Sequence, residues 1–302
     1  MKLLLTGAFK YSSSQIEYLK NMGFDITFIQ DERIPIDSDV SDIDAVICNG
    51  LFLHTPIENF KNLKFVQLTS AGLNRVPLDY INQYNIKLCN ARGVYSAPMA
   101  EFALCGVLDL YKKSRIFYEN QKNHKWEKYR GLQELSGKNV LIIGAGDIGG
   151  AVAKRFKAFD TSVAGIDPYR KSSEAFDVIY STENLDEQLT FADIVVLTLP
   201  LTDDNEGFFD GKKFALMKST AVFVNIARGK LVNQNDLIDA LASNQIAGAV
   251  LDVFDKEPLD DKSPLWDMNH VILTPHNSFE GELNNKRMFD LIKKNLEGFL
   301  NE

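Results

Sequence analysis

A glycine-rich turn between an apolar segment and an amphipathic one constrains the fold of this chain more than any other feature. Residues 140–143 are apolar, and the chain then reads Gly144-Ala-Gly146-Asp-Ile-Gly149 before a stretch with helical apolar spacing. The first glycine permits a tight turn, the second lets the backbone approach a pyrophosphate, and the third allows close packing of helix on strand. The pattern predicts a dinucleotide-binding unit with the phosphates at the positive end of the helix. The residues expected to contact the cofactor here are Gly144, Gly146, Asp147, Ile148 and Gly149.

An acidic residue, Asp167, stands 18 positions after the third glycine, at the end of the next predicted strand. Its carboxylate can accept hydrogen bonds from both ribose hydroxyls and would repel a 2′-phosphate, which favours NAD over NADP. Alternatively, Asp167 serves only to begin the Asp-Pro turn and does not contact the ribose. Arg170 and Lys171 lie close enough in sequence to accommodate a 2′-phosphate. NAD is therefore the predicted cofactor, with NADP not excluded.

Short apolar runs alternate with amphipathic stretches along the whole chain, which is the pattern of parallel sheets covered by helices. We expect strands at residues 2–5, 25–29, 45–47, 65–68, 87–89, 140–143, 162–166, 194–199, 221–225, 248–253 and 270–273. We expect helices at residues 13–22, 97–110, 148–159, 233–241 and 284–300, and a surface connection around Gly131. With 302 residues the chain is long enough for two such α/β domains.

The composition argues against several other classes of protein. The net charge is −8 and the basic residues form no block, whereas nucleic-acid binding depends on clustered Lys and Arg. No stretch approaches the roughly 20 apolar residues that cross a bilayer. Cys48, Cys89 and Cys105 lie in apolar runs without CxxC spacing, so we expect buried free thiols, a cytoplasmic location and no bound metal.

Three ionisable residues follow three late strands, at the edge where ligands bind in an open parallel sheet. They are Arg228, Glu257 and His276. Singly, each has a plainer explanation: Arg228 as a surface residue, Glu257 as a loop carboxylate, His276 as a structural histidine of a turn. Together they supply what reduction of a 2-oxo acid requires. A guanidinium binds the carboxylate, an imidazolium donates a proton to the carbonyl oxygen, and a carboxylate on the other ring nitrogen fixes the tautomer.

In order and spacing, four motifs resemble the D-isomer-specific 2-hydroxyacid dehydrogenase family, which includes D-lactate, phosphoglycerate and glyoxylate/hydroxypyruvate enzymes. They are GAGDIG at 144–149, NIARGKLVN at 225–233, LDVFDKEPL at 251–259 and SPLWDMNHVILTPHNS at 263–278. The resemblance implies catalytic roles for Arg228, Glu257 and His276. It also implies cofactor contacts from Pro200, Ala227 and Asp252, the last with the nicotinamide, and a carboxylate-binding loop at Ser70, Ala71 and Gly72. Residues 49–51 and 90–93 resemble neighbouring segments of the cleft.

The fold that this resemblance implies is discontinuous. It consists of two Rossmann-like, doubly wound parallel-sheet domains with a cleft between them. Residues 1–100 and 277–302 would form a flavodoxin-like substrate-binding domain, and residues 101–276 the NAD(P)-binding domain. Family members are usually dimers, and aromatic residues between 111 and 129 would either support such an interface or cover the chain's own core.

The sequence thus predicts an oxidoreductase that moves hydride between NAD(P)H and C2 of a small 2-oxo or D-2-hydroxy acid. The substrate's side chain would meet the loops around Leu51, Phe52 and Leu73. Two alternatives remain open: a corepressor-like protein that senses nucleotides on the same fold, and a phosphonate dehydrogenase. An intact set of Arg228, Glu257 and His276 disfavours the sensor, because a sensor needs no proton donor.

Overall fold

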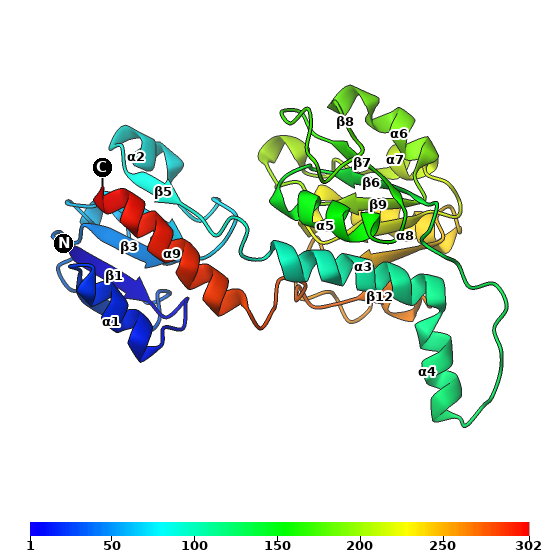
Figure 1. The fold of residues 1–302 in the computed structure, drawn as a ribbon, viewed down its shortest axis with the longest axis horizontal. Coiled ribbons are helices and arrows are strands. Elements are labelled where there is room, and N and C mark those ends of the chain that lie inside the picture. Colours follow the sequence, from blue (N-terminus) through cyan, green and yellow to red (C-terminus); the bar gives the residue numbers. More distant parts are fainter. Residues whose placement is uncertain (302) are drawn as a thin grey trace. The chain divides into compact units, whose positions relative to one another are not determined.

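The computed structural model describes residues 1–301 and divides the chain into two compact units (Figure 1). Unit 1 consists of Met1–Tyr95 together with the described residues from Gly281 onward, and unit 2 is Ser96–Glu280. The first boundary differs from the expected one at residue 100, because the helix α3 (Ser96–Lys112) belongs to unit 2 as a whole.

Within its described residues, unit 1 contains one parallel five-stranded sheet, in the order β2-β1-β3-β4-β5. The strands are β1 (Lys2–Thr6), β2 (Asp25–Ile29), β3 (Ala45–Cys48), β4 (Phe65–Leu68) and β5 (Lys87–Cys89). The helices are α1 (Ser13–Asn21), α2 (Leu78–Gln83) and α9 (Asn284–Leu300), with short 3-10 turns at Leu51–Leu53 and Ile57–Asn59.

The two faces of this sheet carry separate hydrophobic cores, because successive side chains of a strand point to opposite faces. Leu3 and Leu5 of β1 pack on one face, where the core includes Leu19 of α1 and Ile292 of α9. Leu4 packs on the other face, in a core that includes residues from both 3-10 turns and from α2. The last helix thus covers the first strand, and α9 crosses the unit 1 sheet in Figure 1.

Unit 2, as far as it is described, contains a parallel seven-stranded sheet in the order β12-β11-β10-β9-β6-β7-β8. The strands are β6 (Asn139–Ile143), β7 (Ser162–Ile166), β8 (Val178–Tyr180), β9 (Ile194–Leu197), β10 (Val222–Asn225), β11 (Gly248–Leu251) and β12 (Val271–Leu273). Besides α3 the helices are α4 (Ser114–Lys122), α5 (Asp147–Lys157), α6 (Leu185–Phe191), α7 (Gly211–Leu216) and α8 (Gln234–Ala242).

The helices of unit 2 cover both faces of its sheet. Helices α6, α7 and α8 bury their apolar residues against one face, in a core with Leu141 and Leu197 at its centre. Helix α3 packs on the other face beside α5, and it approaches so closely that a Cβ on Gly106 would lie 2.5 Å from Val250 of β11. Helix α4 continues from α3 and projects away from the sheet (Figure 1).

The predicted fold class, two parallel-sheet α/β domains, is confirmed. The prediction of three buried thiols is confirmed for Cys48, whereas Cys89 is half-buried, and the prediction is wrong for Cys105, which is exposed on α3. No helix of residues 1–301 is both long and apolar enough to cross a membrane. Over the same residues, no group of three or more His, Cys, Asp or Glu side chains is placed to hold a metal ion.

Candidate active site

All the candidate site segments of unit 2 leave the sheet from one edge. The register pairs the last residues of five strands in a line across the sheet: Ile143, Leu197, Asn225, Leu251 and Leu273. Because these strands are parallel, the glycine-rich turn and the segments carrying the three ionisable residues follow them on the same side. This is the carboxyl edge at which open α/β sheets bind their ligands.

The glycine-rich turn after β6 can exist only with glycine at its first and third positions. Gly144 has φ +104°, and a Cβ there would lie 2.8 Å from the Leu199 nitrogen. A Cβ on Gly149 would lie 2.1 Å from the Gly144 carbonyl oxygen. These contacts fix the close approach of α5 to the strand.

The second glycine lies at an open position. Gly146 is the N-cap of α5, no side chain caps the helix, and nothing lies within 4 Å of a Cβ built there. The first amides of a helix have no partner within the helix and carry its positive end. With the half-buried Asp147 and Ile148 in the first turn, this helix start has the donors and the space that a pyrophosphate requires.

Asp167 lies beside the glycine-rich turn and is held by three backbone amides. Its Oδ2 accepts a hydrogen bond from the Ala145 nitrogen at 3.0 Å, and its Oδ1 accepts from Tyr169 and Arg170, each at 2.9 Å. Burial alone would raise the pKa of Asp167, but these hydrogen bonds outweigh it and hold the pKa below its ordinary value. The carboxylate thus does initiate the Asp-Pro turn, and it also ties that turn to the glycine loop.

Two further cofactor candidates lie on loops after neighbouring strands. Pro200 is exposed, and its carbonyl oxygen accepts a hydrogen bond from Asn205 Nδ2 at 2.8 Å. Ala227 is buried; its nitrogen donates to Asn225 Oδ1 at 3.1 Å, and its carbonyl oxygen accepts from Arg228 Nη1 at 2.7 Å.

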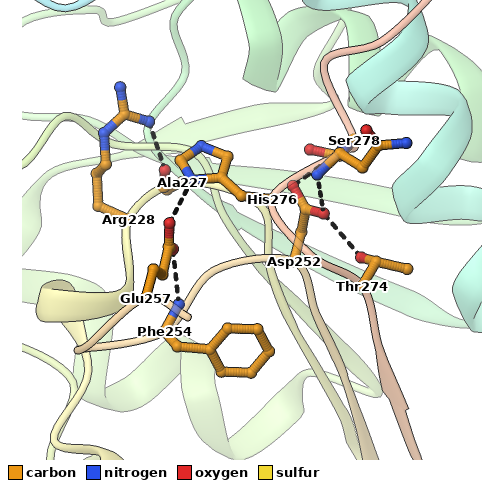
Figure 2. Close-up of polar contacts among 9 residues, drawn as sticks. Ala227, Arg228, Asp252, Phe254, Glu257, Thr274, His276 and Ser278 are labelled. Atoms are coloured by element: carbon orange, nitrogen blue, oxygen red, sulfur yellow. Dashed lines mark hydrogen bonds and ion pairs between the residues drawn. The ribbon is translucent and has the colours of Figure 1, made fainter. Parts of the chain in front are cut away.

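Glu257 and His276 form a hydrogen-bonded pair. Glu257 Oε2 lies 2.8 Å from His276 Nδ1, and each side chain is 39% exposed. The other carboxylate oxygen accepts from the Phe254 nitrogen at 3.1 Å, which fixes the carboxylate in place. Figure 2 shows the carboxylate pointing toward the imidazole ring. Since Nδ1 faces Glu257, Nε2 is the ring nitrogen left to meet a substrate.

Arg228 stands on a loop held by a side chain that sequence reasoning missed. Asn225, the buried last residue of β10, accepts from the Ala227 nitrogen and donates through Nδ2 to the Arg228 carbonyl oxygen at 3.1 Å. The next residue, Gly229, touches the loop of Glu257, because a Cβ on Gly229 would lie 1.9 Å from the Phe254 carbonyl group. The loops of Arg228 and Glu257 therefore pack directly against each other. A polar residue ending an apolar strand is the sequence signal for Asn225.

Asp252 lies deeper than expected. Its side chain is fully buried, and its carboxylate accepts hydrogen bonds from the Thr274 hydroxyl at 2.7 Å, the Asn277 nitrogen at 2.7 Å and the Ser278 nitrogen at 3.0 Å (Figure 2). These donors flank His276. The geometry shows that Asp252 holds the histidine loop, and its expected contact with the nicotinamide stays a prediction.

In unit 1, the loop of Ser70, Ala71 and Gly72 follows β4 at the carboxyl edge of the sheet. Among the described residues, the amide N–H groups of these three residues have no hydrogen-bond acceptor, whereas each of their carbonyl oxygens accepts a hydrogen bond. A row of unpaired amides with no negative group turned toward it is a recurring anion-binding feature.

The loops expected to meet the substrate's side chain are only partly accessible. Leu51 itself is fully buried in the unit 1 core. Phe52 packs against the same core, edge to face with Phe60. Leu53 is 60% exposed and Leu73 37% exposed, so these two leucines remain available to a ligand. The apolar run of residues 51–53 gave no signal of which member points outward.

Comparison with known proteins identifies the family to which this chain is similar. Residues 104–278 match the family model described as D-isomer specific 2-hydroxyacid dehydrogenase, NAD binding domain. The chain is 32% identical over 273 residues to a hydroxypyruvate reductase of Blautia hydrogenotrophica, covering 87% of this chain and 84% of the relative.

Two solved structures of D-isomer specific 2-hydroxyacid dehydrogenases share the fold. The NAD complex from Lactobacillus delbrueckii ssp. bulgaricus has a TM-score of 0.80 and 25% identity, over 100% of this chain and 97% of the other. The complex with NADPH and MES from Xanthobacter autotrophicus Py2 has a TM-score of 0.78 and 26% identity, over 97% and 92%. The chain is therefore an NAD(P)-dependent oxidoreductase that belongs to the D-isomer specific 2-hydroxyacid dehydrogenase family.

Proposed function

We propose that this enzyme reduces the C2 carbonyl of a small 2-oxo acid to the D-2-hydroxy acid, and catalyses the reverse oxidation, with His276 as the acid and base. The observation that carries the proposal is the contact of 2.8 Å between His276 Nδ1 and Glu257 Oε2. It orients the imidazole and leaves its other ring nitrogen to face a substrate, which is what a proton donor to a carbonyl oxygen needs.

Each of the three ionisable residues has a separate task in this proposal. Bound nicotinamide supplies or accepts the hydride at C2. His276 Nε2 donates the proton to the carbonyl oxygen during reduction and removes it during oxidation. Glu257 keeps the ring in position through its hydrogen bond with Nδ1. Arg228 binds the substrate carboxylate and polarises the carbonyl group, since a guanidinium can form two parallel hydrogen bonds.

We propose that the amides of Ser70, Ala71 and Gly72 bind the same carboxylate. Their lack of an acceptor among the described residues supports this assignment. Unit 1 would then be the substrate-binding domain. Leu53 and Leu73, both exposed near this edge of unit 1, favour a small apolar substituent on the substrate over a charged one.

For the cofactor we propose a preference for NADH over NADPH, with phosphates at the start of α5 and the ribose at Asp167. The ionised carboxylate at the end of β7 supports it, because a 2′-phosphate would be repelled there. The role of Asp167 in the turn does not preclude this contact, since a carboxylate offers about four acceptor sites.

We also propose that the enzyme is a homodimer formed through the α4 region. None of the residues of α4 is buried in one chain, yet Ile116, Phe117 and Tyr118 are 37–69% exposed on it. Large apolar side chains left exposed along a helix that one chain does not cover favour a protein interface there. Sedimentation equilibrium is expected to give twice the chain mass of 34.0 kDa. Phe117→Lys should give a monomer, and a monomeric wild type would contradict the proposal.

The test of the proposed reaction follows NADH and NADPH oxidation with glyoxylate, hydroxypyruvate, pyruvate, and branched and aromatic 2-oxo acids, with phosphite oxidation as the alternative. We expect NADH-dependent reduction, and a loss of kcat of at least about 10²-fold in His276→Ala. The matched control is His270→Gln, because within residues 1–301 the one hydrogen-bond partner of His270 Nε2 is the Leu241 carbonyl oxygen, at 3.3 Å. A His276→Ala enzyme with wild-type kcat would remove this histidine from the mechanism.

A further inference from the structure

The loop that follows β4 has an unusual pattern of hydrogen bonds: four consecutive carbonyl groups are each held by a donor from unit 1. The Thr69 oxygen accepts from the Tyr95 hydroxyl at 2.5 Å, the Ser70 oxygen from the Ala91 nitrogen at 2.9 Å, the Ala71 oxygen from Asn90 Nδ2 at 2.6 Å, and the Gly72 oxygen from the Ser70 hydroxyl at 3.0 Å. All of the long-range donors come from the segment that follows β5.

These four contacts determine where the amides of the loop point. A trans peptide is planar, so its N–H group and the preceding C=O group point in opposite directions. Each carbonyl group that is held in residues 69–72 therefore also fixes the direction of the amide that follows it, in residues 70–73. None of those four amides donates to an acceptor within residues 1–301.

We infer that Asn90 is a positioning residue for substrate binding: it sets the direction of the Gly72 amide, and so the affinity for the substrate's carboxylate, without touching the substrate. The inference deepens the proposed function and rests on it. Asn90 is suited to this role because it also accepts through Oδ1 from the Arg92 nitrogen at 3.3 Å. Its side chain is thereby held at both ends, and its amide nitrogen is kept against the Ala71 oxygen.

Of the four contacts, the hydrogen bond from Asn90 to the Ala71 oxygen is the one whose donor can be replaced by an acceptor of the same size. In Asn90→Asp the oxygen that accepts from Arg92 can stay, but the donor to Ala71 is replaced by an oxygen that repels the carbonyl group. Asn90→Ala removes both contacts. If the Asn90 side chain served only to fix its own segment, Asp would be nearly neutral and Ala would be harmful. If it positions the loop, both substitutions weaken binding of the carboxylate, and Asp weakens it more.

The chain offers a matched control in the same unit. Asn285 Nδ2 donates to the Lys10 carbonyl oxygen at 2.7 Å, and Asn285 Oδ1 accepts from Gln15 Nε2 at 3.1 Å. Asn285→Ala thus removes an asparagine with the same two kinds of contact, made to Lys10 and Gln15 and not to the loop. It reports what the loss of such a bridge does to stability alone.

The experiment measures KM and kcat for the best 2-oxo acid at saturating NADH, together with the Kd of NADH and of oxalate, in wild type and the three variants. A carboxylate is bound equally in the ground state and the transition state, so KM should rise while kcat stays within twofold. We expect KM and the oxalate Kd to rise about tenfold in Asn90→Ala and further in Asn90→Asp, as for loss of one well-placed hydrogen bond. NADH Kd, and all constants of Asn285→Ala, should stay within twofold.

The outcomes separate this inference from the proposed function. A wild-type enzyme that reduces 2-oxo acids, with both Asn90 variants unchanged in KM, would overturn the inference and leave the function standing. An equal loss in kcat and KM would also overturn it, since a group acting only on carboxylate binding does not alter the chemical step. If wild type reduces no 2-oxo acid but binds oxalate, and Asn90→Asp weakens that binding, the function fails and the inference holds. A wild type that binds neither 2-oxo acids nor oxalate contradicts both.

Discussion

At the scale of single residues, one buried carboxylate determines where His276, the proposed proton donor, stands. His276 has φ +51°, in the left-handed region that a residue with a Cβ seldom adopts. Such a conformation costs on the order of 1–3 kcal/mol and persists only where the surroundings enforce it. Asp252 provides that enforcement, because its carboxylate accepts three hydrogen bonds from Thr274, Asn277 and Ser278 while its carbonyl oxygen accepts from the His276 nitrogen at 2.8 Å.

Asp252→Asn should therefore harm catalysis more than cofactor binding. In Asp252→Asn one oxygen becomes an NH₂ group, which cannot accept. If that group replaces Oδ2 it faces the Ser278 nitrogen, and if it replaces Oδ1 it faces the Thr274 hydroxyl and the Asn277 nitrogen. We expect kcat to fall more than tenfold and the free energy of unfolding to fall by about 1–3 kcal/mol, with the Kd of NADH within threefold of wild type. Steady-state kinetics, urea denaturation and NADH fluorescence titration measure these three quantities.

The control for this prediction is Asp236→Asn. Asp236 Oδ2 accepts from the Gly211 nitrogen at 2.8 Å, in the same unit but away from His276. It should lose stability and keep its kcat. A large increase in the Kd of NADH in Asp252→Asn would instead support a direct contact between Asp252 and the nicotinamide.

Asp167 allows a prediction of pH dependence. Its pKa in the folded chain lies below the ordinary value of 3.8, so its ionised form favours the folded state. This stabilisation is fully present above the ordinary pKa and is lost as the pH falls through the lower, folded-state value. Wild type should thus be more stable than Asp167→Asn at pH 7, and the difference in unfolding free energy should shrink as the pH falls below 3.8.

The same variant tests the proposed cofactor preference. Without a negative charge at the end of β7, the ratio of kcat/KM for NADH to that for NADPH should fall by about tenfold or more. Urea denaturation between pH 3 and 7 and parallel assays with both cofactors measure the two effects. If this ratio stays unchanged while stability falls, Asp167 stabilises the turn but does not select the cofactor. Arg170 and Lys171 would then be the next residues to test for cofactor selection.

At the scale of elements, the junction of β6, its turn and α5 has almost no tolerance for change. The third glycine is the tightest point, because its Cα faces the carbonyl oxygen of Gly144. Its neighbour Gly150 lies in the same helix, one position further along, and a Cβ there would meet only the Cβ of Ala175, at 3.9 Å. Comparing substitutions at these two adjacent glycines therefore distinguishes the effect of a Cβ at the tight turn from the effect of alanine on the helix itself.

Gly149→Ala should displace α5 from the strand and disrupt the pyrophosphate site. We expect the Kd of NADH to rise at least about tenfold, since a Cβ cannot stand 2.1 Å from an oxygen. Gly150→Ala should bind NADH as wild type does and gain up to about 1 kcal/mol of stability from helix propensity. Calorimetric titration and thermal unfolding provide the measurements, and equal behaviour of the two variants would contradict the assigned roles.

The elements that could be predicted from the sequence are those with strong periodicity or a clear turn. The strands of both sheets other than β8 follow from apolar runs, and α9 agrees with the predicted range of residues 284–300. Helices α2, α6 and α7 were missed because each has only six or seven residues, too few to show a helical period. Helix α4 was missed for another reason: it buries none of its residues, so it has no apolar face turned to a core.

The candidate site divides in the same way. The pairing of Glu257 with His276 could be predicted, since both residues follow late parallel strands and their chemistry is complementary. The depth of Asp252 and the bridge from Asn90 could not, because each depends on contacts between segments 20 or so residues apart that no local pattern encodes. The buried position of Leu51 depends on packing alone.

At the scale of the whole molecule, the chain crosses twice between its units. Unit 2 is one continuous segment, whereas unit 1 joins the first 95 residues to the final helix. Helix α9 supplies Met288, Ile292 and Leu296 to the core that also contains Leu3 and Leu5 of β1. One face of the unit 1 sheet is therefore completed by residues nearly 300 positions away in sequence.

Ile292→Ala should destabilise unit 1 selectively. The side chain is fully buried, so its truncation is expected to cost about 2–5 kcal/mol. Leu300→Ala, on the same helix but 41% exposed, should change stability by no more than about 0.5 kcal/mol. Hydrogen exchange followed by mass spectrometry should find faster exchange in β1 and β3 of Ile292→Ala, with unit 2 unaffected. Uniformly faster exchange across both units would indicate that they unfold as one.

The position of α9 in the sequence also determines the order in which the two units can complete their folding during synthesis on the ribosome. Unit 2 is available for folding once its last segment has been translated, although it comes second in the gene. The earlier-made sheet must wait for α9 with the surface around Leu3 and Leu5 uncovered. Until then this hydrophobic surface is accessible to chaperones and to neighbouring nascent chains.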